Sequence, residues 1–138
     1  PELYAAVTCS APLLDMVRYE RWGLGATWAE EYGSAADQEQ LRWLLDYSPY
    51  HHVEAGRRYP ATLFTVFDSD TRVDPLHARK MCAALQWAAG TAGRGPDDRP
   101  ILLRREKDVG HGARALSRSV EVSVDMLAFL ARWTGLPL

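Results

Sequence analysis

Three features are scarce in this 138-residue sequence: long apolar runs, runs of basic residues and cysteines. No apolar stretch approaches the roughly 20 residues of a membrane span, so no membrane partner is predicted. No Lys/Arg run exceeds two residues and the net charge is −2, so the basic surface that binds nucleic acid is not expected. Cys9 and Cys82 are predicted to be buried, reduced thiols of a cytosolic protein, with a disulfide as the alternative.

What the sequence does have is the composition of one globular domain. Hydrophobic residues make up 47% and charged residues 25%, which is typical of a folded chain, and the length allows one compact domain with one core. The first residue is Pro1, and a strand-like run begins close behind it at Tyr4. We therefore expect a piece of a longer protein, produced by cleavage, by a split gene or by expression of a part.

Strand-like and helical stretches alternate along the chain. The strand-like runs are 4–9, 61–67 and 100–104, and the second is rich in β-branched and aromatic residues. Helical spacing marks the stretches between them, and Asp74-Pro75 supplies an N-cap and a first-turn proline for one helix. This order predicts an α/β fold with about three parallel strands and crossover helices.

The last helix is predicted to be well buried, because its apolar residues recur at helical spacing over a wide face. These residues are Val120, Val122, Val124, Met126, Leu127, Phe129, Leu130 and Ala131. Four tryptophans elsewhere are assigned to packing, namely Trp22, Trp43, Trp87 and Trp133.

An acid and a histidine follow two successive predicted strands. Asp70 stands after the strand that ends at 67, and His111 stands after the next one, within Gly110-His111-Gly112. Taken alone, each is most often an ordinary turn or loop residue, as Asp68 is expected to be. Groups at the carboxyl ends of parallel strands meet at one edge of a sheet, and an acid followed by a histidine is typical of α/β-hydrolases. We therefore predict a carboxylate that orients an imidazole base.

Four ordered motifs carry a resemblance to a known family. They are Tyr47-Ser48-Pro49-Tyr50-His51-His52-Val53, Tyr59-Pro60-Ala61-Thr62-Leu63, Asp68-Ser69-Asp70-Thr71-Arg72-Val73-Asp74-Pro75-Leu76-His77 and Gly110-His111-Gly112-Ala113. In this order they resemble the prolyl oligopeptidase family of serine peptidases, and the similarity covers essentially the whole chain. The resemblance implies that residues 1–138 are the C-terminal part of the family's α/β-hydrolase catalytic domain.

The resemblance implies roles for three residues near the reacting bond. Asp70 matches the acid of the family's catalytic triad, and His111 matches its base. Arg72 matches the arginine that binds the substrate backbone near the cleaved bond, a role that suits the rigid fork of donors on a guanidinium. No metal or other cofactor is implied.

The resemblance also implies an apolar pocket for a proline ring. Trp28 matches the tryptophan that stacks on that ring, and Tyr32, Val73 and Leu13 would complete the pocket. Judged from composition alone, a core tryptophan is the favoured interpretation of Trp28.

Two acidic residues leave a different specificity open. Glu30 and Glu31 could accept a basic side chain, as acidic pockets do in the related oligopeptidase B type, although we expect them to form a solvated face. His51, His52 and His77 are expected to be capping or surface residues, and their spacing indicates no metal site.

The nucleophile is missing from the sequence. The family's serine lies in a Gly-x-Ser-x-Gly turn, and no serine here has that glycine frame. The oxyanion donors next to that serine and the family's β-propeller are absent as well. We therefore expect the chain to need the upstream part of the same peptidase and to be inactive alone.

These observations predict a cytosolic serine-type peptidase that cleaves short peptides after proline, with a proline-containing peptide as its substrate. An oligopeptidase B-like enzyme or an esterase on the same fold is the enzymatic alternative. The non-catalytic alternative is a truncated domain that self-associates through an open sheet edge.

Overall fold

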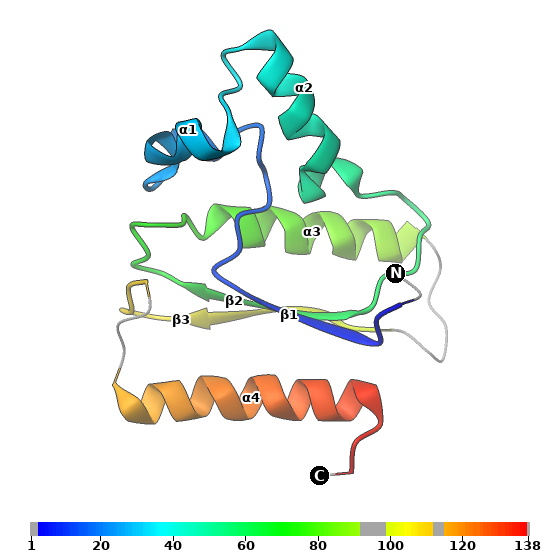
Figure 1. Ribbon diagram of the computed structural model, residues 1–138. Helices are drawn as coiled ribbons and strands as arrows, with labels where there is room; N and C mark the ends of the chain where they lie inside the picture. The colour runs from blue at the N-terminus through cyan, green and yellow to red at the C-terminus, as the bar shows by residue number, and fades with distance from the viewer. Residues whose placement is uncertain (1–2, 92–98, 112–114, 138) are drawn as a thin grey trace.

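The computed structural model describes residues 3–91, 99–111 and 115–137. Three parallel strands form one sheet in the order β1 (Ala6–Ser10), β2 (Ala61–Phe67) and β3 (Ile101–Glu106). Helix α3 (Leu76–Thr91) covers one face of the sheet and helix α4 (Leu116–Thr134) covers the other (Figure 1). The prediction of an α/β fold with three parallel strands is therefore confirmed.

The central strand explains where the main core lies. All seven residues of β2 are buried, as expected for a parallel strand covered on both faces. Its neighbours pair in register, with Ala6 opposite Ala61 and Thr62 opposite Ile101. The buried residues of this core are Phe64, Val66, Ala78, Cys82, Leu85 and Ile101.

Between β1 and β2 the chain leaves the sheet and builds a cap beyond α3. This cap contains η1 (Tyr19–Arg21), η2 (Gly25–Trp28), α1 (Ala29–Tyr32), α2 (Gln38–Tyr47) and η3 (Pro49–His52). Figure 1 shows α1 and α2 on the side of α3 that faces away from the sheet. A second, smaller hydrophobic cluster of Met16, Tyr19 and Leu44 holds the cap together.

The last helix is less buried than the sequence predicts. Val122 and Ala131 are buried, whereas Val120, Val124 and Leu127 are each more than half exposed. A single sheet covers only one face of a helix, so an apolar stripe wider than that face remains outside. The prediction of a well-buried helix is wrong for that outer stripe.

Two of the tryptophans assigned to packing lie at the surface. Trp43 is 50% exposed and Trp87 is 62% exposed. Each neighbours a buried residue on its own helix, Leu44 on α2 and Ala88 on α3. Adjacent helical positions lie about 100° apart around the axis, so a buried position leaves its neighbour turned away from the core.

The two cysteines are free. Cys82 is buried and Cys9 is partly buried, and burial raises the pKa of both thiols. Among the described residues, no helix is both long and apolar enough to cross a membrane.

Candidate functional site

The loop after β2 holds Asp70 in a defined turn. One carboxylate oxygen, Oδ1, accepts hydrogen bonds from the backbone N–H groups of Arg72 at 2.9 Å and Val73 at 3.0 Å. An aspartate that binds its own backbone two and three residues ahead fixes such a turn. The side chain is almost fully buried, and Oδ2 remains available for another partner.

That partner is His111, which follows β3. The His111 Nδ1 lies 2.7 Å from Asp70 Oδ2. Because an ionised carboxylate can only accept, Nδ1 carries the hydrogen of this contact, and in the neutral ring Nε2 then keeps its lone pair. The imidazole is 37% exposed while the carboxylate is 1% exposed. The geometry thus suits a buried acid that orients a solvent-accessible base.

The histidine loop is tied to the acid loop through the backbone. The N–H of Asp68 donates to Glu106 O at 2.9 Å, and the N–H of Ser69 donates to Val109 O at 3.1 Å. Asp108 turns the chain with a φ of 56°, a left-handed conformation that aspartate tolerates. These contacts bring His111 to Asp70. Gly112, on the far side of the histidine, lies outside the described residues.

Ion pairs fix the end of β3, from which the histidine loop departs. The buried carboxylate of Glu106 pairs with Arg104 and lies 3.7 Å from Arg118 Nη1 on α4. Arg104 also binds Asp125 of α4 at 2.6 Å. Sequence reasoning missed this group, because its members are separated along the chain and form no motif.

The side chains predicted to form the proline pocket fall into two groups. Leu13 and Trp28 pack against the Met16–Tyr19–Leu44 cluster, and the Tyr32 ring meets the Tyr19 ring edge-on at 5.8 Å. Val73 instead lines a small hollow beside Asp70 and α3. Burial, followed by nearby acidic groups, raises the pKa of Tyr19 to about 12, so this tyrosine stays neutral.

Three further predicted positions are at the surface. Arg72 is exposed, and its carbonyl accepts a hydrogen bond from Leu24 N–H at 3.0 Å. Glu30 and Glu31 are both exposed, as predicted for a solvated face.

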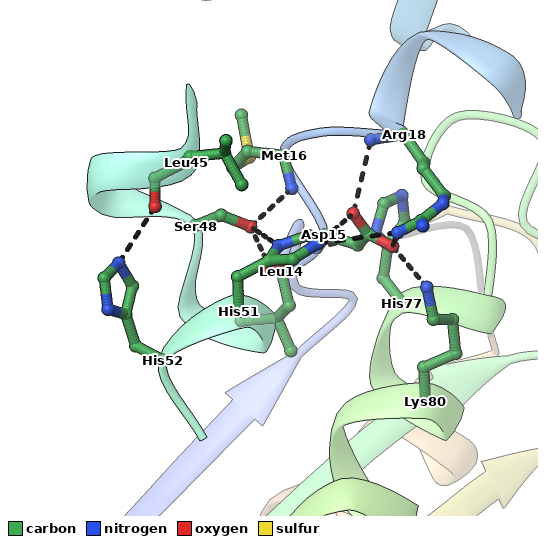
Figure 2. A network of polar contacts seen from close by, with 10 residues as sticks. All are labelled: Leu14, Asp15, Met16, Arg18, Leu45, Ser48, His51, His52, His77 and Lys80. Atoms are coloured by element: carbon green, nitrogen blue, oxygen red, sulfur yellow. Dashed lines mark hydrogen bonds and ion pairs between the residues drawn. The ribbon is translucent and has the colours of Figure 1, made fainter. Parts of the chain in front are cut away.

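A buried polar network between the cap and α3 was not anticipated (Figure 2). Asp15 is fully buried, and its carboxylate accepts from Lys80 Nζ and from Arg18. Its backbone N–H donates to His77 Nδ1 at 3.1 Å. His77 is itself buried, so its prediction as a capping or surface residue is wrong. Burial lowers its pKa.

The same network contains a serine and a second histidine. Ser48 Oγ lies 2.8 Å from His51 Nδ1, and His51 Nε2 lies 4.0 Å from Asp15 Oδ1. The residue types match a catalytic triad, but Ser48 is fully buried and accepts a hydrogen bond from Met16 N–H. No peptide bond can reach it, so this trio is structural.

The remaining histidine, His52, behaves as a cap. Its Nε2 lies 2.9 Å from Leu45 O near the end of α2, which agrees with the capping prediction. Within the described part of the chain, no group of three or more potential metal ligands comes together.

A family model and two curated relatives agree on the family that this chain resembles. The prolyl oligopeptidase family model matches residues 1–137. The chain is 38% identical over 131 residues to a prolyl endopeptidase of Elizabethkingia miricola, and this match covers 94% of the chain and 18% of that protein. It is 37% identical over 140 residues to the prolyl oligopeptidase dbiP of Dendrothele bispora, covering all of the chain and 18% of the relative.

Solved structures show the same similarity. One comes from a structural and mechanistic analysis of two prolyl endopeptidases: it matches with a TM-score of 0.91 and 47% identity over 99% of the chain and 20% of the neighbour. A post-proline cleaving enzyme from Rickettsia typhi matches with a TM-score of 0.88 and 31% identity over the whole chain and 19% of the neighbour. The chain therefore spans about a fifth of the length of these relatives.

Proposed function

The chain belongs to the prolyl oligopeptidase family, and on this premise we propose that it supplies the acid and the base of a serine-type peptidase that cleaves after proline. The observation that carries the proposal is the 2.7 Å contact between His111 Nδ1 and Asp70 Oδ2. It leaves the other imidazole nitrogen free, beside two loops at the carboxyl ends of neighbouring parallel strands.

The proposed mechanism assigns one task to each residue. A serine outside this chain attacks the substrate carbonyl, and His111 Nε2 takes its proton and later delivers that proton to the leaving amine. Asp70 holds Nδ1–H, which fixes the tautomer and stabilises the imidazolium that forms. The serine and its oxyanion donors come from an upstream part of the same peptidase, because no Gly-x-Ser-x-Gly turn occurs in residues 1–138.

Proline specificity is proposed from the cap. Leu13 and Trp28 pack against one cluster of the cap, and the ring of Tyr32 contacts Tyr19 of that cluster. Flat aromatic faces such as those of Trp28 and Tyr32 suit a rigid pyrrolidine ring. Arg72 is exposed next to the acid loop, where its guanidinium can bind a substrate carbonyl. Relatives described as prolyl endopeptidases and as a post-proline cleaving enzyme support this choice of substrate.

The decisive experiment uses two matched proteins, the full-length peptidase and the 138-residue chain. Esters or short peptides with proline, arginine or alanine before the cleaved bond serve as substrates. We expect the full-length protein to prefer proline and the 138-residue chain to show no turnover. A preference for arginine would favour the oligopeptidase B-like alternative, and turnover by the short chain would refute the proposal that the nucleophile lies outside it.

A further inference from the structure

The segment that follows β1 crosses the boundary between the two hydrophobic clusters. Leu14 packs against the sheet and α3, whereas Met16 belongs to the second cluster in the cap. Asp15 stands between them and is fully buried. A buried carboxylate is costly unless it is paired and hydrogen-bonded, so its partners define how the cap sits on the sheet domain.

Three successive backbone groups at this boundary bind three different partners. Leu14 O accepts from Tyr50 N–H at 3.0 Å, Asp15 N–H donates to His77 Nδ1 at 3.1 Å, and Met16 N–H donates to Ser48 Oγ at 3.0 Å. Because Nδ1 must offer a lone pair to the amide, His77 is held as the neutral tautomer with its hydrogen on Nε2.

Helix α3 binds the same residue through a side chain. His77 and Lys80 are three residues apart and therefore lie on one face of the helix. Lys80 Nζ binds the Asp15 carboxylate and sits 4.1 Å from the centre of the Tyr50 ring. Burial alone would raise the pKa of Asp15, but Lys80, with help from Arg18, lowers it. The ionised Asp15 side chain thus attaches the segment after β1 to helix α3.

A second attachment joins the same segment to the acid loop. Leu24 N–H donates to Arg72 O at 3.0 Å. Gly23 has a φ of +58°, and a Cβ at this position would lie only 2.5 Å from Arg72 O. Both the positive φ and the short distance to Arg72 O require glycine at position 23.

Both attachments meet the chain just after Asp70, at Arg72 and at His77. The Gly23–Leu24 attachment is a hydrogen bond to Arg72, two residues after Asp70. The Asp15 attachment is a hydrogen bond to His77 at the start of α3. The segment that makes both attachments also carries Leu13 and leads directly to Trp28. Resting on the proposed peptidase function, we propose that Asp15 and His77 are positioning residues that hold the proline pocket in a fixed place relative to Asp70 and Arg72.

The proposal separates recognition from chemistry. Loosening the Asp15 attachment shifts the pocket but leaves the contact between Asp70 and His111 in place, because that contact depends on backbone bonds between the loops after β2 and β3. Misplaced binding groups impair substrate positioning. The loss should therefore appear mainly in KM and in the choice of substrate, with a smaller change in kcat.

The test compares two substitutions at one position in the full-length peptidase. His77→Leu removes the acceptor for the Asp15 amide, whereas His77→Asn keeps an oxygen near the place of Nδ1. Trp87→Ala, on the exposed side of the same helix, is the control for surface changes on α3. The readouts are kcat and KM for matched prolyl and alanyl substrates, and the hydrogen exchange rate of the peptide spanning residues 12–28.

We expect His77→Leu to raise KM for the prolyl substrate about tenfold, with kcat within about threefold. The preference for proline over alanine should fall, and exchange across residues 12–28 should accelerate. His77→Asn should restore most of each property. An unchanged preference together with unchanged exchange overturns the proposal, as does a fall in kcat with KM and exchange unaltered.

Two further outcomes are covered. If His77→Leu does not fold, Lys80→Met takes its place and is judged by the same criteria, because it removes the contact between Lys80 and the Asp15 carboxylate. If the wild-type enzyme shows no preference for proline, the proposed function fails; acceleration of exchange at residues 12–28 then still decides whether the attachment exists.

Discussion

Within the described residues, the Asp70–His111 pair and the Asp15–His77 pair are built in opposite ways. In the first, Asp70 accepts from His111 Nδ1 and the imidazole keeps an exposed edge. In the second, both side chains are buried, the ionised Asp15 carboxylate pairs with Lys80, and His77 accepts from a backbone amide. The residue types are the same, yet only the first pair has a free, solvent-accessible nitrogen.

This difference teaches that the role of a histidine depends on which nitrogen accepts and what can reach the other. His111 donates through Nδ1, so protonation at Nε2 strengthens its bond to the carboxylate. His77 accepts through Nδ1, so protonation there would break its bond to Asp15. The first arrangement can cycle a proton, whereas the second is stable only while the ring stays neutral.

The largest expected effect separates the two histidines by activity. In the full-length peptidase, His111→Asn should lower kcat by about 10⁵-fold or more, because the general base is removed. His77→Leu should act mainly on KM, by about tenfold, and should change kcat far less. Steady-state hydrolysis of a prolyl ester measures both variants. Comparable losses of kcat from the two substitutions would erase the distinction between the pairs.

A subtler change tests the orientation of the active imidazole. Asp70→Asn preserves the Oδ1 acceptor that binds Arg72 and Val73 N–H, so the turn should survive. The amide NH₂ then replaces Oδ2 and forces His111 Nδ1 to become an acceptor, which is the state of His77. We expect kcat to fall by about 10⁴-fold.

The matched control for this variant is Asp68→Asn, which alters the neighbouring aspartate that pairs with Arg105 and Arg79 at the surface. A loss of less than about tenfold in Asp70→Asn would contradict the role of Asp70 in fixing the tautomer. A similar loss in Asp68→Asn would show that any charge removed from this loop has the same effect.

The contrast between the pairs also explains what could be predicted from the sequence. Asp70 and His111 are 41 residues apart, but each follows one of two adjacent parallel strands, and the topology brings strand ends together. Asp15 and His77 are 62 residues apart, and Asp15 follows a strand by way of an irregular segment whose path no periodicity describes. The contact between Asp70 and His111 therefore follows from a general rule of parallel sheets. The contact between Asp15 and His77 can be found only from the three-dimensional structure.

The same limit applies to burial. The run of residues in β2 is mostly apolar and rich in β-branched and aromatic residues, so its burial on both faces was predictable. Helical spacing on α4 shows which residues share a face, but it does not show how much of that face a neighbour covers. Val120, Val124 and Leu127 are exposed for this reason, and Trp43 and Trp87 were misassigned in the same way.

A smaller effect is expected on the stability of the buried pair. Lys80→Met leaves the Asp15 carboxylate buried without its main partner, since the Lys80 side chain is 27% exposed and that of Asp15 is 1% exposed. We expect the free energy of unfolding to fall by about 2 kcal/mol, below the usual cost of a fully buried pair because Lys80 is partly solvated. Urea unfolding of the 138-residue chain, followed by tryptophan fluorescence, measures this loss.

The neighbouring substitution Arg79→Met provides the control for Lys80→Met. Arg79 is exposed and pairs only with Asp68 among the ion pairs of the described residues, so its removal should cost much less. Adding Asp15→Asn to Lys80→Met should recover part of the lost stability, because the uncompensated charge is gone. Equal losses from the two single substitutions would show that the Asp15 pair is no more than a surface interaction.

The smallest expected effect is a pH dependence of stability to which His77 contributes. Burial, followed by opposing effects of Asp15, Asp74 and Lys80, lowers the pKa of His77 below its ordinary value of 6.5. The unfolded chain therefore binds a proton at a higher pH than the folded chain does. The stability from neutral His77 is fully present above about pH 6.5 and is lost as the pH falls below that value, by at most about 1.4 kcal/mol per pH unit. His77→Asn should remove this slope between pH 6.5 and 5.5 and leave a residual slope from His51, whose pKa is also lowered chiefly by burial. Asp15 does not interfere, because its pKa is lowered from 3.8 and it titrates below this range.

Unfolding curves in urea at half-unit pH steps measure the slope of the unfolding free energy against pH. An undiminished slope in His77→Asn would mean that the proton is taken up by another group.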